Sequence, residues 1–379
     1  MSLYIDIHAL QTLPPSNINR DESGAPKSAV FGGVNRQRVS SQAWKRAIRN
    51  EFKDELDKLQ VGTRTKRIVD ITIARIEEID KSWLEATGKE AVVKTITEAF
   101  KSAGIKKIEP PKAKEGSEEE PELPRTDYLI FLSNHQIDKL AHWIVENNGA
   151  KISKRDAQGI LDSDHSIDIA MFGRMIADLP DYNVDASVQV AHAISVHGAE
   201  PEFDYFTAVD DEVEKKEETG AGMIGTVQIM SSTLYRYATI NIEQLKDNLG
   251  ETMATSAAVA AFLRSFVTSM PTGKINSFAN HTLPEALVVS VRDDRPISFV
   301  NAFEVPVSDK GEGGRRVQAA NRLAAEAKAI EEAYSSPAKK TFVLGIGEVN
   351  KELEKIGEPA TLDAIVNGVT ELVESESSK

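Results

Sequence analysis

The sequence predicts an α+β fold in which a β-rich core carries an inserted helical region. An opening strand places Leu3, Ile5 and Ile7 on one face. Residues 60–180 show mainly the periodicity of amphipathic helices, and the chain after Pro180 returns to patterns typical of strands. This order of elements fits a split βαββαβ core with insertions.

The opening strand leads into a loop rich in turn-forming residues, and a helix is expected to begin near Ser40-Ser41, both good N-caps. The apolar side of this helix is formed by Trp44, Ala47, Ile48 and Phe52. Lys45, Arg49 and Lys53 recur every four residues on a neighbouring face. The helix can therefore dock on a sheet and still offer a basic edge.

Further helices are expected at 64–83, 89–103, 128–147, 154–162 and 166–177, with an acidic, low-complexity linker at 110–121. In the second half, we expect strands within 187–197, 224–241 and 286–291, and helices at 243–270, 317–334 and 362–374. Residues 198–223 carry glycines and acids between two strands, which indicates a protruding hairpin or a long loop.

Composition narrows the classes of function. With 379 residues, 41% of them apolar, the chain can bury a substantial core. It has no cysteine, which excludes disulfides and thiol nucleophiles and favours a reducing, cytoplasmic location. No apolar run approaches the roughly 18 residues of a membrane span, and the N-terminus lacks the pattern of a signal peptide. No membrane partner is therefore expected.

The net charge of −14 argues against a nucleic-acid partner, but the charges are unevenly distributed. Residues 20–53 hold eight Lys/Arg and three Asp/Glu, a local excess of +5. Acids gather at 115–122, at 210–218 and after Glu371. A basic strip on an acidic body would confine a polyanion to one track, although an ordinary solvated face explains the same charges.

Signals for catalysis are weak. Gly273-Lys274 lacks the other residues of a P-loop, and Gly345-Ile346-Gly347 is only a fragment of a dinucleotide-binding motif. The seven histidines are scattered, without the spacing of a metal site. No catalytic residue, metal ion or other cofactor is therefore expected.

Signals for binding are stronger. Residues 17–21, 31–33 and 38–46 combine hydroxyl groups and backbone N–H groups at a helix start with flanking Arg and Lys, which suits a chain of phosphates. An ordinary capped amphipathic helix accounts for the same residues equally well.

Several collinear blocks carry a resemblance to a known family. The first block runs from Asp6-Ile7-His8 through Asn17-Ile18-Asn19-Arg20-Asp21 and Phe31-Gly32-Gly33 to Arg38-Val39-Ser40-Ser41-Gln42. The others are Val190-Ala191-His192-Ala193-Ile194, Phe203-Asp204-Tyr205-Phe206-Thr207-Ala208-Val209-Asp210-Asp211, Leu234-Tyr235-Arg236-Tyr237-Ala238 and Asn301-Ala302-Phe303-Glu304. Together they resemble the CasC (Cse-type) backbone subunits of the type I-E CRISPR Cascade complex, which belong to the Cas seven family. The match is weaker at 85–125 and over the last 70 residues.

The resemblance implies an RRM-like (ferredoxin-like) palm at 1–59 and 181–379, a helical finger domain at 60–180, and a β-hairpin thumb inserted in the palm at 198–224. It implies a non-catalytic subunit that binds crRNA and polymerises head-to-tail with copies of itself along the guide. The subunit would kink the guide at regular intervals and present it for pairing with target DNA, beside other Cascade subunits.

Carried over residue by residue, the resemblance implies a set of RNA-binding residues in the palm. These are Arg20, Lys27, Arg38, Ser40, Ser41, Gln42, Lys45, Arg46 and Arg49. Phe206 and Thr207 would lie in the thumb, where an aromatic ring separates stacked bases, and Met175 would wedge from the finger side. Core packing is the alternative for Phe206 and Met175.

A second hypothesis is a metal-dependent, RNA-cleaving CRISPR backbone subunit. Related subunits of other CRISPR types cut the paired RNA strand with an aspartate in a palm loop. Asp21 is the nearest candidate here and His8 a distant second, but no general acid, base or ligand set can be assembled around Asp21. A third hypothesis, a scaffold without RNA, leaves the basic strip at 20–53 unexplained.

Overall fold

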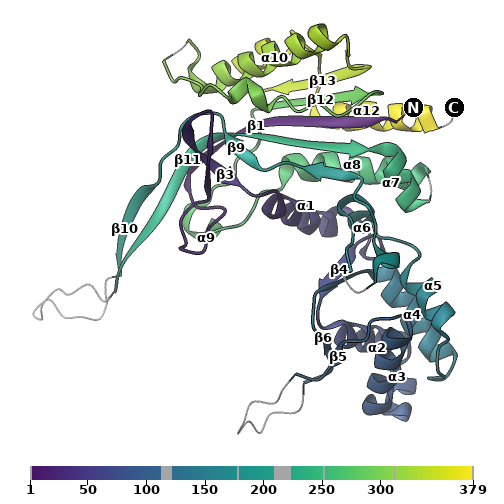
Figure 1. Cartoon of the computed structure of the whole chain (residues 1–379). Helices are drawn as coiled ribbons and strands as arrows, with labels where there is room; N and C mark the ends of the chain where they lie inside the picture. The colour runs from purple at the N-terminus through teal and green to yellow at the C-terminus, as the bar shows by residue number, and fades with distance from the viewer. Residues whose placement is uncertain are drawn as a thin grey trace, which may run out of the picture. The chain divides into compact units, whose positions relative to one another are not determined.

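The computed structural model describes residues 2–111, 122–176, 179–208, 223–250, 252–310 and 312–377. The chain divides into two compact units, which are described separately (Figure 1). The first unit contains Met1–Glu51, Gln189–Ile242 and Val259–Lys379. The second unit contains Phe52–Val188 and Glu243–Ala258.

A large mixed sheet forms the first unit, and its strands follow the order β14-β13-β12-β1-β11-β9-β3-β2. In that order, their bounds are Glu358–Pro359, Lys340–Gly345, Ala286–Arg292, Tyr4–Ser16, Met223–Asn241, Ala193–Ser195, Val34–Val39 and Ser28–Phe31. β1 pairs antiparallel with both β11 and β12, β11 pairs antiparallel with β9, and β13 pairs parallel with β14. The expected α+β class is confirmed.

Strand β1 is buried on both faces, because helices cover the sheet on either side. On one face, Arg236 of β11 lies between Trp44 of α1 (Ser41–Glu55) and Phe266 of α8 (Thr252–Thr268). On the other face, Leu10 and neighbouring apolar residues pack in one cluster with α10 (Gly314–Tyr334) and α11 (Glu348–Leu353). The sheet is therefore the middle of three layers in this unit. Helices α9 (Ile275–Phe278) and α12 (Leu362–Ser377) and the 3-10 turn η3 (Val300–Phe303) complete it.

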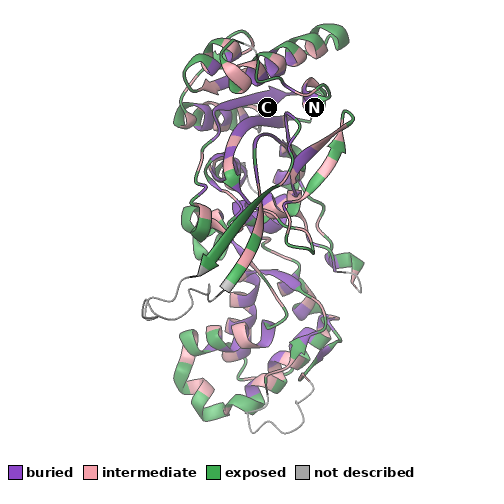
Figure 2. Ribbon diagram, turned by 90° about the vertical axis from the view of Figure 1, so that its left-hand side faces the viewer, coloured by how far each residue is buried: buried purple, intermediate pink, exposed green. Residues whose placement is uncertain are grey.

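A long hairpin projects from this sheet (Figure 1). β1 pairs with the second part of β11, as far as Met230, whereas β10 (Glu202–Ala208) pairs with the first part, Met223 to Ile229. Residues 202–207, which form most of β10, are all exposed, and the ribbon of this strand is green in Figure 2. The hairpin expected at 198–224 thus has two described strands, while its connection and Asp210-Asp211 lie outside the described residues.

The second unit is mostly helical but contains short strands that the sequence analysis did not expect. Its helices are α2 (Ile68–Thr87), α3 (Lys89–Ser102), α4 (Asn134–Glu146), α5 (Lys154–Leu161), α6 (Ile167–Phe172) and α7 (Ile242–Leu249). Its strands are β4 (Gly62–Thr65), β5 (Ile108–Glu109), β6 (Arg125–Thr126) and β7 (Ile130–Ser133), with 3-10 turns at η1 (Lys58–Gln60) and η2 (Pro180–Tyr182). Short β8 (Val188–Val190) belongs instead to the large sheet of the first unit, in which it pairs with β11. Most of the linker expected at 110–121 lies outside the described residues.

Four of the expected helices have the wrong bounds. The helix expected over 64–83 begins only at Ile68, because Gly62–Thr65 pairs as β4 with β7. The helix expected over 128–147 begins only at Asn134, because the buried run at 130–133 pairs as β7 with β4. The helix expected over 166–177 ends at Phe172, and Gly173 follows it with a φ of 78°. The single helix expected over 243–270 is divided into α7 and α8 at Gly250, whose φ is 77°.

The division into units also differs from the expected domain bounds. The range expected for the finger, 60–180, lies inside the second unit, but 243–258 was expected in the palm. The side chain of Asn248 donates hydrogen bonds to the carbonyls of Ala170 and Asp185, both at 2.8 Å. These contacts attach α7 to the helical unit. No helix in the described ranges is long and apolar enough to cross a membrane.

Candidate nucleic-acid interface

The loop after β1 is fastened to the start of α1 by backbone-directed hydrogen bonds. The Asn19 side chain accepts a hydrogen bond from the Ser40 N–H at 2.8 Å, and the Asn19 carbonyl accepts one from the Lys27 N–H at 2.9 Å. The Lys27 carbonyl in turn accepts from the Arg38 N–H at 2.8 Å. The folded chain therefore brings Lys27 and Arg38 to the beginning of α1.

Helix α1 separates its apolar and basic sides as expected. Trp44, Ala47, Ile48 and Phe52 are all buried. Gln42 and Arg46 are exposed, whereas Lys45 and Arg49 are partly buried. Burial lowers the pKa of Lys45. We call the cations Arg20, Lys27, Arg38, Lys45, Arg46 and Arg49 the basic surface.

Two of the first amide groups of α1, those of Ser41 and Ala43, have partners within the protein, so these two are not free to bind phosphate as expected. The Ser41 N–H donates to Nδ1 of His192 at 2.9 Å, and the Ala43 N–H donates to the Ser40 hydroxyl at 3.3 Å. Ser40 itself is buried, so it acts as a helix cap. Because Nδ1 of His192 accepts, its neutral ring carries the proton on Nε2.

His192 lies among the cations of this surface, although its position in the sequence did not predict this. Burial lowers its pKa, and the charges of Arg38 and Lys27 lower it further. The imidazole is therefore neutral at pH 7 and leaves the local charge to the Lys and Arg side chains. Only the long-range pairing of β9 with β3 brings His192 to α1, so sequence spacing carried no signal for it.

Among the described residues, no salt bridge neutralises Arg20, Lys27, Arg38 or Arg46. Arg20 and Arg46 are exposed, and Arg38 has one long contact, 3.5 Å, from Nε to the Ser28 carbonyl. Unpaired, solvated cations keep their charge available for an anionic ligand. Arg20 also lines a shallow hollow of about 440 Å³ with Asn19, Asp21 and Gly273.

Arg36, which contributes to the basic strip in the sequence, does not belong to the basic surface. It is fully buried and donates hydrogen bonds to the carbonyls of Phe31, Ser195, Phe303 and Glu304 at 3.0–3.1 Å. A Cβ atom at Gly32 would lie 1.7 Å from the Glu304 carbonyl oxygen. The motifs at 31–33 and 301–304 are therefore two sides of one structural contact.

Phe206 and Thr207, which were expected in the thumb, are exposed near the end of described β10, and Phe206 retains 43% of its accessible surface. Phe206 pairs across the hairpin with Gly225, and a Cβ at Gly225 would meet its ring at 2.3 Å. The glycine thus lets the ring lie flat over β11. Strand alternation places Phe203 and Tyr205, 72% and 61% exposed, on the opposite face. Neither residue was predicted to contact RNA, although strand alternation in the sequence indicates their exposure.

Met175 lies in the second unit and is 82% exposed. The neighbouring Arg174 and Ile176 are each only 3% exposed. Met175 therefore follows α6 in an extended segment and points away from the core. Core packing does not explain Met175, but its contact with RNA stays a prediction.

The two residues considered for catalysis have structural contacts. Oδ1 of Asp21 accepts from the Ser23 hydroxyl at 2.7 Å, the Ser23 N–H at 2.9 Å and the Ala25 N–H at 3.0 Å, and these bonds lower its pKa. His8 is fully buried, stacks on Phe299 at 4.3 Å and bonds to the Tyr235 hydroxyl at 2.8 Å. Burial lowers the pKa of His8 to about 3. Within the described ranges, no group of three His, Asp or Glu residues is placed to hold a metal ion.

The fold and the basic surface define an α+β protein suited to holding a polyanion. Comparison with protein families shows that residues 5–368 match the family of CT1975-like proteins, a Cas family. The chain belongs to this family of CRISPR backbone proteins, which confirms the resemblance found in the sequence.

Two solved structures resemble the chain over nearly its whole length. One is a chain of a pre-nicking CRISPR RNA-guided surveillance complex, with a TM-score of 0.84, 35% identity, and coverage of 98% of this chain and 100% of that chain. The other is a chain of a CRISPR RNA-guided surveillance complex, with a TM-score of 0.71, 30% identity, and coverage of 96% and 99%. A comparison with curated proteins gives no match.

Proposed function

We propose that this protein is a non-catalytic, crRNA-binding backbone subunit of a type I-E CRISPR surveillance complex. The observation that carries the proposal is its likeness, over 98% of its length and at 35% identity, to a chain of an RNA-guided surveillance complex. The basic surface supplies the electrostatic attraction that such a role requires.

The topology supports an RRM-like palm. Four strands of the sheet lie in the order β12-β1-β11-β9 and pair antiparallel. Helix α1 lies between β1 and β9 in the chain, and α8 lies between β11 and β12, so two split βαβ units interleave. In this proposal, the helical unit is the finger and the β10–β11 hairpin is the thumb.

In this proposal, the palm binds the phosphate backbone of the guide. Arg20, Lys27, Arg38 and Arg46 attract phosphates without selecting bases, because phosphate contacts carry no sequence information. Pairing between the guide and target DNA then supplies the specificity. The same subunit can therefore serve any guide.

Phe206 and Met175 interrupt the stack of bases. Stacking of a base on an aromatic ring is worth about 1–3 kcal/mol and tolerates any base, so an exposed Phe206 can replace a neighbouring nucleotide. An exposed Met175 offers a narrow, flexible wedge. Repeated in every copy, these contacts kink the guide at regular intervals and flip one base away from pairing.

Copies assemble head-to-tail along the guide beside other Cascade subunits. A heterologous contact that does not close on itself generates an open helical filament. The length of the guide then limits the number of copies.

RNA loading tests the proposal. Lys45→Ala with Arg49→Ala is expected to reduce the amount of guide that co-purifies with the complex for every guide sequence tested, because the basic surface loses two positive charges. A loss limited to particular guides would contradict sequence-independent binding.

Incubation of the complex with complementary RNA and Mg²⁺ tests the non-catalytic assignment. We expect no cleavage, because Asp21 is committed to its own turn. Cuts at fixed intervals that disappear in Asp21→Ala would favour the metal-dependent, RNA-cleaving alternative.

A further inference from the structure

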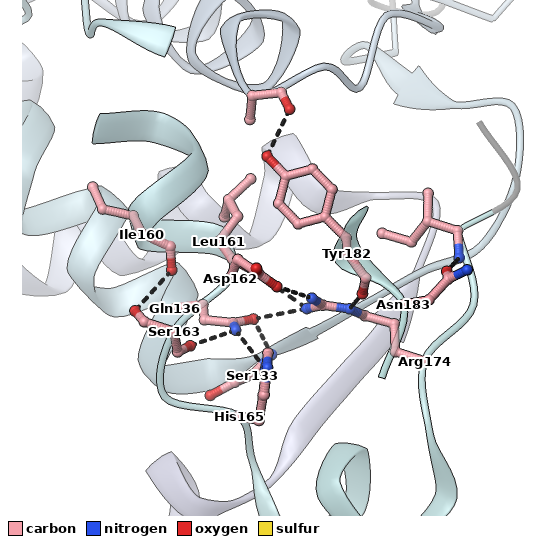
Figure 3. A network of polar contacts seen from close by, with 12 residues as sticks. Ser133, Gln136, Ile160, Leu161, Asp162, Ser163, His165, Arg174, Tyr182 and Asn183 are labelled. Carbon is pink, nitrogen blue, oxygen red and sulfur yellow. Dashed lines mark hydrogen bonds and ion pairs between the residues drawn. The ribbon is translucent and has the colours of Figure 1, made fainter. Parts of the chain in front are cut away.

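The exposed Met175 is flanked by a buried polar network whose centre is the guanidinium group of Arg174 (Figure 3). All residues of this network belong to the second unit. Arg174 is the residue immediately before Met175, and only 1% of its side chain is exposed. Burial of a charged group with this many donors is costly unless each donor finds an acceptor.

Each of the three nitrogen atoms of the guanidinium group has a partner. Nε donates to the Tyr182 carbonyl at 2.8 Å, Nη1 donates to the Leu161 carbonyl at 3.3 Å, and Nη2 forms a salt bridge with Oδ1 of Asp162 at 3.1 Å. Leu161 ends α5, and Tyr182 ends the turn η2. Arg174 therefore ties the segment before Met175 to two separate elements.

The partners of Arg174 are themselves fixed. The Tyr182 hydroxyl donates to the Ala103 carbonyl at 2.7 Å, and its ring lies 5.8 Å from the guanidinium carbon. Gln136, whose Oε1 is 3.5 Å from Nη1, donates to the Ser163 carbonyl at 2.6 Å. The network therefore extends from α4 to η2, and its hydrogen bonds restrain the side chains that surround Arg174.

The backbone on both sides of Met175 is held as well. Arg174 and Val184 form an antiparallel bridge with hydrogen bonds of 3.0 Å and 2.9 Å. The Ile176 N–H donates to Oδ1 of Asn183 at 2.8 Å. Before the bridge, Gly173 has a φ of 78° and a Cβ there would lie 2.8 Å from the Val184 carbonyl oxygen. Two buried residues with fixed backbone thus present one exposed side chain between them.

We propose that Arg174 is a positioning residue, which holds Met175 as a rigid wedge against the guide. This inference rests on the proposed function, in which Met175 unstacks the RNA. An exposed methionine on a mobile loop would collapse onto nearby apolar surface rather than separate two bases. Anchoring the backbone from behind removes that freedom before the guide arrives.

The test uses the assembled complex, loaded with guides that carry 2-aminopurine at successive positions. Its fluorescence rises where a base is unstacked, so the wild-type complex should give peaks at regular intervals. Met175→Ala should lower these peaks toward the level of the stacked positions, because the wedge is lost. Arg174→Met keeps an unbranched apolar side chain but removes every hydrogen-bond donor, and it should lower the fluorescence peaks to a similar height. The measurement is made at a temperature at which circular dichroism shows that the variant is folded.

Graded and control variants separate positioning from general stability. Arg174→Lys should give intermediate peaks, because an ammonium group keeps the charge but not the planar fork of donors. Arg155→Gln, at an exposed residue of α5 in the same unit, should leave the peaks at wild-type height. If Arg174→Met does not fold, Asp162→Asn and Arg174→Lys take its place, and both should lower the peaks.

The outcomes distinguish this inference from the proposed function. Wild-type peaks that fall in Met175→Ala but stay unchanged in all folded network variants would overturn the inference and leave the function standing. A wild-type complex without periodic peaks, or peaks unaffected by Met175→Ala, would overturn both the wedge and the positioning role.

Discussion

In the proposed function, the number of phosphates that the basic surface contacts sets the salt dependence of guide binding. Arg20 and Arg46 are exposed, belong to no salt bridge among the described residues, and lie on two separate segments of the surface. Arg20→Gln with Arg46→Gln removes two charges per copy without opening a cavity. For single-stranded RNA, each lost contact lowers the slope of log K against log salt by about 0.7, so the pair lowers it by about 1.4 per copy.

This change is measurable by fluorescence anisotropy of a labelled guide over a series of salt concentrations. Between about 0.1 M and about 0.3 M salt, the double variant should lose about fivefold less affinity per copy than the wild type. Arg295→Gln with Lys351→Gln is the matched control, because both side chains are exposed and lie outside the basic surface. An unchanged slope in Arg20→Gln with Arg46→Gln, or an equal change in the control, would refute the placement of the guide on this surface.

Three further predictions concern the fold and the thumb. Gly32→Ala should lower the free energy of unfolding in urea by about 3 kcal/mol, because a Cβ would lie 1.7 Å from the Glu304 carbonyl oxygen. Gly33→Ala is the control: this position has a positive φ but open space around it, so the substitution should lower the free energy of unfolding by only about 1 kcal/mol. Phe206→Ala should weaken guide binding by about 1–3 kcal/mol per copy at unchanged melting temperature, and equal binding would contradict stacking. Burial raises the pKa of Asp6 from 3.8 to about 6, so protonation favours the folded state between these values and stability falls as pH rises through them. In Asp6→Asn, the unfolding free energy relative to wild type should therefore rise by roughly 3 kcal/mol from pH 3 to pH 7, and a flat difference would contradict the raised pKa.

Local patterns were sufficient to predict helix α1 and its division into two sides. Trp44, Ile48 and Phe52 recur at helical spacing and are buried, and the Ser40 cap marks the helix start. Short apolar runs were ambiguous. All four residues at 130–133 are buried, and a short buried run of this kind is compatible with either a strand or a helix. It forms a strand because it pairs with β4, which the sequence pattern alone does not show.

Contacts between distant segments could not be predicted from spacing. Arg36 counts as a surface cation in the sequence, but it is buried because carbonyls from Ser195, Phe303 and Glu304 converge on it. His192 and Ser41 are 151 residues apart in the chain, and the pairing of β9 with β3 brings them into contact. Met175 was expected on a helix, and its extended, anchored segment depends on Gly173 and on partners from two other elements.

Expression of this protein with its CRISPR array and neighbouring genes, followed by sizing and nucleic-acid extraction, tests the central claim most directly. The proposed function predicts a large particle that contains several copies of this chain and one short RNA of uniform length. A nucleic-acid-free monomer under the same conditions would contradict it.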